Sequence, residues 1–259
     1  MVEIVYIATG EYVNYFDEFA ESLKYFWPGE PKILRILSDV ERDFYVENSD
    51  IVDIEYIKIF NLFYPYINLH KTNFIKQLKE TGAEYIFYFD ADTKFIEVKE
   101  NVWQHLKEYM DNEYFIISKH PFYLWSFDDN IRHSYISYFF DTNTERNETG
   151  ASYIDKYDYT YVISSFFCGK RNVVKNICDH IEQMIRYDLK RENNYKLPKF
   201  YDENYFNKIV FDFEYNDCNT FNIKVGEYII TGPPQNSCLN ECETFLNQKG
   251  DSSYKTVKQ

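Results

Sequence analysis

The sequence predicts an α/β protein with a central, mostly parallel sheet flanked by helices. Short apolar runs alternate with segments of helical spacing along the chain, which is typical of this class. One run, residues 85–89, is wholly apolar, as expected for a strand buried on both faces. Apolar residues make up 45% of the 259-residue chain, enough for an ordinary core. We expect one catalytic domain over residues 1–245 and a polar C-terminal tail over residues 246–259.

Each element is predicted from periodicity and from the turn residues that bound it. Strands are expected at residues 4–8, 32–37, 51–59, 85–89, 114–118, 161–167 and 221–230. Helices are expected at residues 13–26, 72–79, 102–110, 173–189 and 203–210. Residues 128–159 have weak periodicity and are interpreted as a long, substrate-facing excursion. Ligands of such sheets bind beyond the carboxyl ends of the strands, so the chemistry is expected there.

The composition excludes several classes of partner. The net charge is −14 and no basic cluster dominates, so no nucleic-acid partner is expected. No apolar run is long enough for a transmembrane segment, and the chain opens on a strand rather than on a signal peptide. Five irregularly spaced Cys residues indicate reduced thiols, so the expected location is cytoplasmic. An acidic protein that binds an anionic substrate needs a metal ion or a few placed cations.

The motif Asp90-Ala91-Asp92 directly follows the predicted buried strand at residues 85–89. Carboxylates two residues apart can reach one hard cation, and Mn²⁺ or Mg²⁺ keeps positions open for substrate phosphates. The pair therefore predicts a metal site that holds a diphosphate, against the alternative of a solvated turn. The aromatic residues of the strand are interpreted as core only.

A second acidic pair, Asp202-Glu203, opens the helix predicted at residues 203–210. Acids in a first helical turn are ordinarily caps that suit the helix dipole. The alternative is a carboxylate that faces the anomeric carbon of a sugar and stabilises an oxocarbenium-like transition state. The two residues alone leave both interpretations open.

The two acidic pairs, in this order, resemble the family 6 glycosyltransferases, which include the ABO blood-group transferases and the α-1,3-galactosyltransferases. The resemblance runs from residue 4 to about residue 228 and is weaker at residues 40–62 and 125–159. It implies a GT-A type fold that binds a nucleotide sugar. It also implies a retaining hexosyltransferase that moves galactose or N-acetylgalactosamine from UDP in α-1,3 linkage onto an oligosaccharide or glycolipid. The implied setting is a microbial cytosol or a virus-infected cell.

The resemblance assigns residues to the donor. Those that fall on uracil-binding positions of the family are Ile7, Thr9 and Tyr12. Lys71 falls on an arginine that contacts the donor near the metal, and it keeps the charge but not the bidentate fork. Asp90-Ala91-Asp92 falls on the manganese-binding D-V-D of the family, so metal dependence is implied.

Further matches concern the sugar and the acceptor. The segment from Asp202 to Lys208 resembles D-E-S-H-L-N-K, so Asp202 is implied to bind the donor sugar. Glu203 is implied to be the nucleophile or the group that stabilises the cation in a front-face path. Ser164 and Ser165 fall where relatives face the donor sugar, and an intermediate-sized Ser165 leaves galactose and N-acetylgalactosamine both open.

Two positions are implied to meet the acceptor. His120 matches a His-Pro pair whose His touches acceptor or donor, and Phe200 replaces a Trp that stacks on the acceptor. Two alternatives remain: a catalytically inactive glycan-binding protein on a transferase scaffold, and a retaining transferase of the same fold that uses another UDP-sugar.

Overall fold

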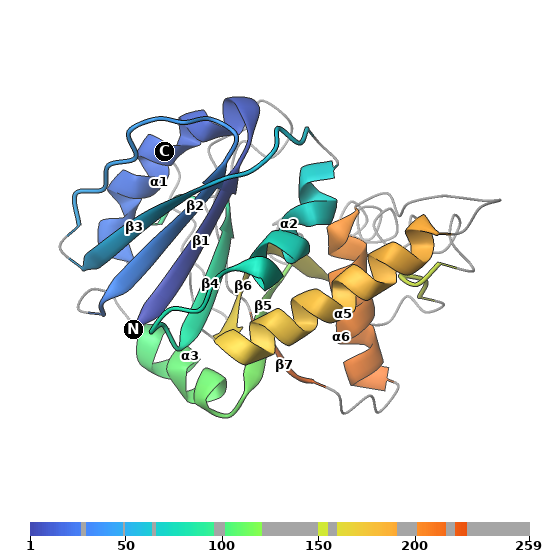
Figure 1. The fold of residues 1–259 in the computed structure, drawn as a ribbon. Coiled ribbons are helices and arrows are strands. Elements are labelled where there is room, and N and C mark those ends of the chain that lie inside the picture. Colours follow the sequence, from blue (N-terminus) through green and yellow to red (C-terminus); the bar gives the residue numbers. More distant parts are fainter. Residues whose placement is uncertain are drawn as a thin grey trace, which may run out of the picture.

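A seven-stranded sheet with helices on both faces organises the chain (Figure 1). The structure is a computed structural model that describes residues 1–26, 30–48, 50–63, 66–95, 102–120, 150–154, 160–190, 201–215 and 221–226. The predicted α/β class with a mostly parallel sheet is confirmed. The tail at residues 246–259 and most of the predicted excursion at residues 128–159 lie outside the described residues.

The strand order is β3-β2-β1-β4-β6-β5-β7. The strands are β1 (Val2–Ala8), β2 (Lys32–Ser38), β3 (Ile51–Lys58), β4 (Tyr85–Asp90), β5 (Tyr114–Lys119), β6 (Val162–Lys170) and β7 (Asn222–Gly226). Among the described strands, only β6 runs against its neighbours, β4 and β5, while the other pairs are parallel. The amino end of β6 therefore lies at the same edge as the carboxyl ends of β1, β4 and β5.

The helices differ from the prediction mainly at residues 13–26, at the start of α2, and at the end of α6, which extends to Tyr215 rather than to residue 210. They are η1 (Gly10–Tyr15), α1 (Phe16–Ser22), η2 (Leu23–Tyr25), α2 (Tyr66–Gln77), α3 (Val102–Asp111), α5 (Arg171–Leu189) and α6 (Asp202–Tyr215). The single helix predicted at residues 13–26 is divided into two 3₁₀ turns and one α-helix. Helix α2 begins at Tyr66 rather than at residue 72, because the Tyr66 and Ile67 N–H groups already donate to the Phe63 carbonyl. Lys71 thus lies inside the helix rather than ahead of it.

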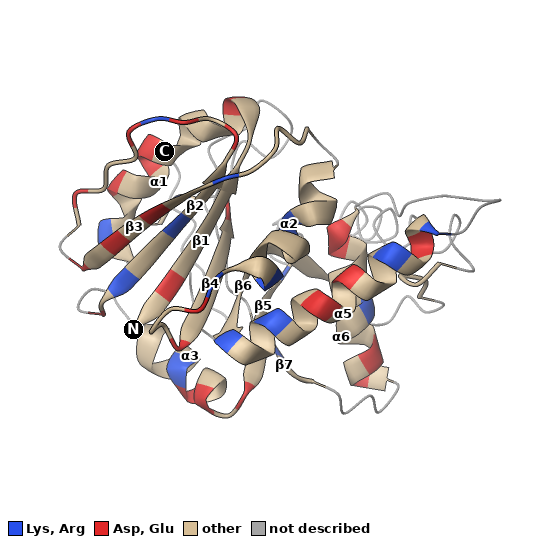
Figure 2. Ribbon diagram, viewed as in Figure 1, with Lys and Arg blue, Asp and Glu red and all other residues tan. Residues whose placement is uncertain are grey.

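Alternation along the strands divides the core into two layers. Helices α1 and α3 pack on the face that receives Tyr6 of β1 and Phe87 and Phe89 of β4. Helices α2, α5 and α6 pack on the other face, with Val5 and Ile86 among its strand residues (Figure 1). No described helix is long and apolar enough to cross a membrane. Acidic and basic residues are interspersed along the ribbon, notably on α5 (Figure 2).

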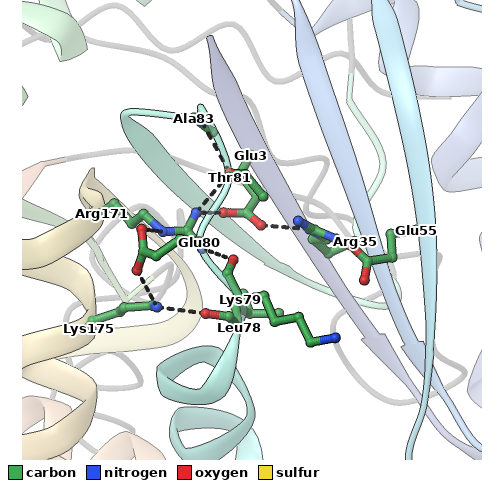
Figure 3. A network of polar contacts seen from close by, with 10 residues as sticks. All are labelled: Glu3, Arg35, Glu55, Leu78, Lys79, Glu80, Thr81, Ala83, Arg171 and Lys175. Carbon is green, nitrogen blue, oxygen red and sulfur yellow. Dashed lines mark hydrogen bonds and ion pairs between the residues drawn. The ribbon is translucent and has the colours of Figure 1, made fainter.

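A buried ion-pair network ties the amino ends of the strands together (Figure 3). Glu3 of β1 is fully buried, and its Oε1 accepts a hydrogen bond from Arg35 Nε of β2 at 2.8 Å. Its other oxygen pairs with Arg171, the first residue of α5. Arg171 Nε also lies 3.1 Å from Glu80 in the connection between α2 and β4. One carboxylate thus joins β1, β2 and α5 at the end of the sheet opposite to the acidic motifs.

Replacing Glu3 by Gln should lower the free energy of unfolding by about 3 kcal/mol, because it removes the buried carboxylate that Arg35 and Arg171 share. The other partners of these two arginines, Glu55 and Glu80, are more exposed. Urea unfolding with an unchanged slope measures this loss. The control is Lys58→Gln, which removes an exposed pair with Glu41 at 4.0 Å and should change little. Equal, small losses in both variants would contradict a central role for Glu3.

Candidate active site

Several predicted site residues lie at one edge of the sheet because of the strand directions. Asp90 ends β4, and the sheet register places Ile7 of β1 beside it. His120 follows the carboxyl end of β5, and Ser164 lies near the amino end of the antiparallel β6. Asp202 is the first residue of α6, and Lys71 connects it to this edge.

The ammonium group of Lys71 is the centre of this arrangement. It lies 2.7 Å from Asp202 Oδ2 and 3.4 Å from Asp90 Oδ1, and it donates to the Ser164 carbonyl at 3.0 Å. The Lys71 residue is only 3% exposed. Burial by itself would lower the pKa of Lys71, but Asp202 and Asp90 outweigh burial and raise it above its ordinary value. Lys71 is therefore a charged crosslink between α2, β4, β6 and α6.

Tyr88 corrects the interpretation that the aromatic residues of β4 are core only. Its hydroxyl donates to Asp90 Oδ1 at 2.7 Å, and Lys71 Nζ lies 4.7 Å from the centre of its ring. Residues two apart in a strand point to the same face, so the spacing of Tyr88 and Asp90 in the sequence already indicates that their side chains can meet. Tyr88 packs in the core and also orients one carboxylate of the acidic motif.

Glu203 points toward the amino end of β6. Its Oε1 accepts a hydrogen bond from the Tyr161 hydroxyl at 2.9 Å, and its backbone carbonyl accepts one from Asn207 Nδ2 at 2.8 Å. Neither Tyr161 nor Asn207 is among the site residues predicted from the sequence. The spacing of four residues between Glu203 and Asn207 places both on one face of a helix, which is the signal that points to Asn207.

The turn into α6 holds its residue Tyr201 in the left-handed region, with φ of 48°. A non-glycine residue adopts this conformation at a cost of roughly 1–3 kcal/mol, which the surrounding structure must offset. The turn delivers Asp202 and Glu203 into the first turn of the helix, where the helix dipole favours negative charge.

The acids of the site are held as a crowded group. Burial raises the pKa of Asp92 to about 6, and the charge of Asp90 adds to this increase. Burial also raises the pKa of Glu203 to about 8, opposed chiefly by the Tyr161 hydrogen bond. The pKa of Asp202 is raised by burial in spite of Lys71. A further cation would oppose these increases, because nearby positive charge favours the ionised form of a carboxyl group.

The acidic pair fits a hard divalent cation. Among the described residues no three His, Cys, Asp or Glu side chains converge as a complete ligand set. Two carboxylates, Asp90 and Asp92, suit Mn²⁺ or Mg²⁺ when substrate phosphates and water complete the coordination. Asp90 keeps 36% of its side chain exposed, so it remains accessible from solvent.

The residues predicted to hold uridine lie at the end of β1. Ile7 is buried in the strand, the Thr9 hydroxyl donates to the Leu62 carbonyl at 2.6 Å, and Tyr12 is 47% exposed in η1. Burial, then the charge of Asp92, raises the pKa of Tyr12, so the Tyr12 phenol lies within electrostatic reach of the acidic pair. Tyr12 is thereby placed near Asp92.

The residues predicted to contact the donor sugar and the acceptor differ in how deeply they are buried. His120 is 7% exposed, its ring centre lies 5.7 Å from that of Tyr161, and burial lowers its pKa to about 3, which keeps it neutral. Ser164 is buried beside Lys71, and Ser165 is half-buried. Phe200 lies outside the described residues.

No model of a known protein family matches the chain, and a comparison with curated proteins also finds no match. The fold and the site define an α/β protein with an acid-rich site at the carboxyl ends of its parallel strands.

Replacing Lys71 by Met should lower the free energy of unfolding by about 3 kcal/mol at neutral pH, because Asp202 and Asp90 lose their buried cation. Without Lys71 the pKa of Asp202 rises further, so Asp202 takes up a proton at a higher pH in the folded variant. A protonated Asp202 needs no cation, so the loss should shrink as the pH falls toward that pKa.

Urea unfolding across a pH series measures this loss. The matched control is Lys76→Met in the same helix, since Lys76 pairs with Asp179 and Glu182 at a more exposed position. A loss that is independent of pH, or equal in the two variants, would contradict the crosslinking role of Lys71.

Proposed function

We propose that this chain is a retaining, metal-dependent glycosyltransferase of the GT-A type that transfers galactose or N-acetylgalactosamine from UDP, in α-1,3 linkage, to a glycan. One observation carries the proposal: Asp90 and Asp202, 112 positions apart in the sequence, meet at a single ammonium group. That meeting joins the motif expected at the metal to the motif expected at the sugar. The mostly parallel sheet with helices on both faces also supports it.

The proposed donor site uses the carboxyl ends of β1 and β4. Ile7, Thr9 and Tyr12 hold the uridine, and Asp90 and Asp92 hold Mn²⁺ or Mg²⁺. A bound divalent ion supplies positive charge that stabilises the departing diphosphate. Lys71 pairs with Asp90, and the Tyr88 hydroxyl donates a hydrogen bond to the same carboxylate. Asp90 is therefore oriented before the substrate binds.

The proposed sugar site lies between β6 and the first turn of α6. Asp202 orients the donor sugar beside Ser164, and Glu203 faces the anomeric carbon. When Glu203 is ionised, its desolvated carboxylate stabilises positive charge on the sugar more strongly than a hydrated one would. Two paths remain compatible with this role: a covalent Glu203 intermediate, or a front-face path in which the departing phosphate takes the acceptor proton.

The first experiment measures UDP release from UDP-galactose, UDP-N-acetylgalactosamine and UDP-glucose, with Mn²⁺ or with EDTA. It is repeated without acceptor and with β-galactoside or fucosylated acceptors. We expect turnover of a galactose-type donor with Mn²⁺ and none with EDTA. Turnover of UDP-glucose alone would favour another retaining transferase, and glycan binding without turnover would favour an inactive glycan-binding protein.

Asp92→Asn should raise the Mn²⁺ concentration needed for half-maximal rate by more than about tenfold. Even groups that only support metal ligands contribute on that scale. Asp111→Asn is the control, since Asp111 pairs with Lys107 on α3. An unchanged Mn²⁺ requirement in Asp92→Asn would contradict the assignment.

Glu203→Gln should keep UDP binding but lower kcat by on the order of a thousandfold, because it removes a charge that acts on the transition state. Glu214→Gln, an exposed position near the end of the same helix, is the control. Isothermal titration with UDP and Mn²⁺ separates binding from turnover. Equal turnover in Glu203→Gln and the unchanged protein would exclude Glu203 from the reaction.

A further inference from the structure

Glu203 is held from two sides by residues that the donor, metal and acceptor assignments do not include. We propose that Tyr161 and Asn207 are positioning residues that fix the Glu203 carboxylate, Tyr161 by hydrogen bonding one of its oxygens and Asn207 by joining its helix to β6. The inference rests on the proposed transferase function, because it concerns the carboxylate assigned to the sugar.

Asn207 ties the first turns of α6 to the amino end of β6. Its side chain is fully buried, and its Oδ1 accepts a hydrogen bond from the Val162 N–H at 2.8 Å. Its Nδ2 donates to the Val162 carbonyl at 2.9 Å and to the Glu203 carbonyl at 2.8 Å. One amide group therefore bonds both backbone groups of Val162 and the backbone of Glu203. This sets the separation between the two segments.

The distance between β6 and α6 that Asn207 sets allows the Tyr161 side chain to reach Glu203. Tyr161 directly precedes Val162, it is fully buried, and its hydroxyl donates to Glu203 Oε1 at 2.9 Å. Its ring packs against the neutral ring of His120. A hydroxyl held in this way fixes the rotation of the carboxylate and favours its ionised form, because a donated hydrogen bond is stronger to a charged acceptor.

The charged surroundings make this hydrogen bond important. Burial is the main influence that raises the pKa of Glu203, and the neighbouring acids Asp202 of α6 and Asp90 of β4 add to it. The opposing influences are the Tyr161 hydroxyl first and the Lys71 ammonium of α2 second. A short-range hydrogen bond therefore does more than the nearest cation to limit the rise in the pKa of Glu203.

The test compares Tyr161→Phe with Tyr205→Phe. Tyr205 is a fully buried residue of α6 whose hydroxyl donates to Asp188 at 2.9 Å, so both variants lose the same kind of hydrogen bond. We expect Tyr161→Phe to raise the pKa of Glu203 by about one unit, since a hydrogen bond to a charged group has about that strength. The acidic limb of the kcat/KM profile should move to higher pH by the same amount, with kcat/KM about tenfold lower on that limb. Tyr205→Phe should leave the limb in place.

Two measurements keep the outcomes separate. Carbon-13 NMR titration of the Glu203 carboxyl group, assigned with Glu203→Gln, reports the shift without any turnover. An unchanged titration in Tyr161→Phe, or an equal shift in Tyr205→Phe, would overturn the inference. A shifted titration in a protein that turns over no UDP-sugar would support the hydrogen bond and reject the transferase function instead.

Discussion

The buried ammonium of Lys71 is the interaction on which the arrangement of the site depends. It lies against Asp90 of β4, Asp202 of α6 and the backbone of β6, so three elements separated in sequence share one charge. A lysine in this place is stable only because its partners are charged and close, since an unpaired buried ammonium would lose its proton. Removing either partner would leave a charge without compensation, which is why such a crosslink constrains all the elements that it joins.

The two ends of the sheet differ in the ratio of acidic to basic side chains. At the amino ends of the strands, buried Glu3 lies between Arg35 and Arg171, and Glu55 and Glu80 also pair with these arginines, so opposite charges are matched. At the carboxyl ends, Asp90, Asp92, Asp202 and Glu203 depend on Lys71, and Asp92 and Glu203 have raised pKa values. The first end stabilises the fold. At the second, four acidic side chains face one lysine, which suits a site that accepts a cation together with an anionic substrate.

The antiparallel direction of β6 brings the two acidic motifs into one site. Had β6 run parallel to β4, its residue Ser164 would lie toward the opposite edge, away from Lys71. The hydrogen bonds of Asn207 to Val162 then hold α6 against the start of β6. The strained residue Tyr201 belongs to the same arrangement, because it turns the chain into the helix that presents Glu203.

The sequence by itself determined the class of fold and the strand that carries the acidic motif, because alternating periodicity and a wholly apolar run are local properties. It also singled out Asp90, Asp92, Asp202 and Glu203 as chemistry-bearing residues. Tertiary structure alone decided that β6 is antiparallel, that Lys71 lies inside a helix and bridges two acids, and that Tyr88, Tyr161 and Asn207 orient them. Periodicity along the chain reports which face of an element is buried. It does not report which distant side chain meets that face, since such pairings depend on strand order and direction.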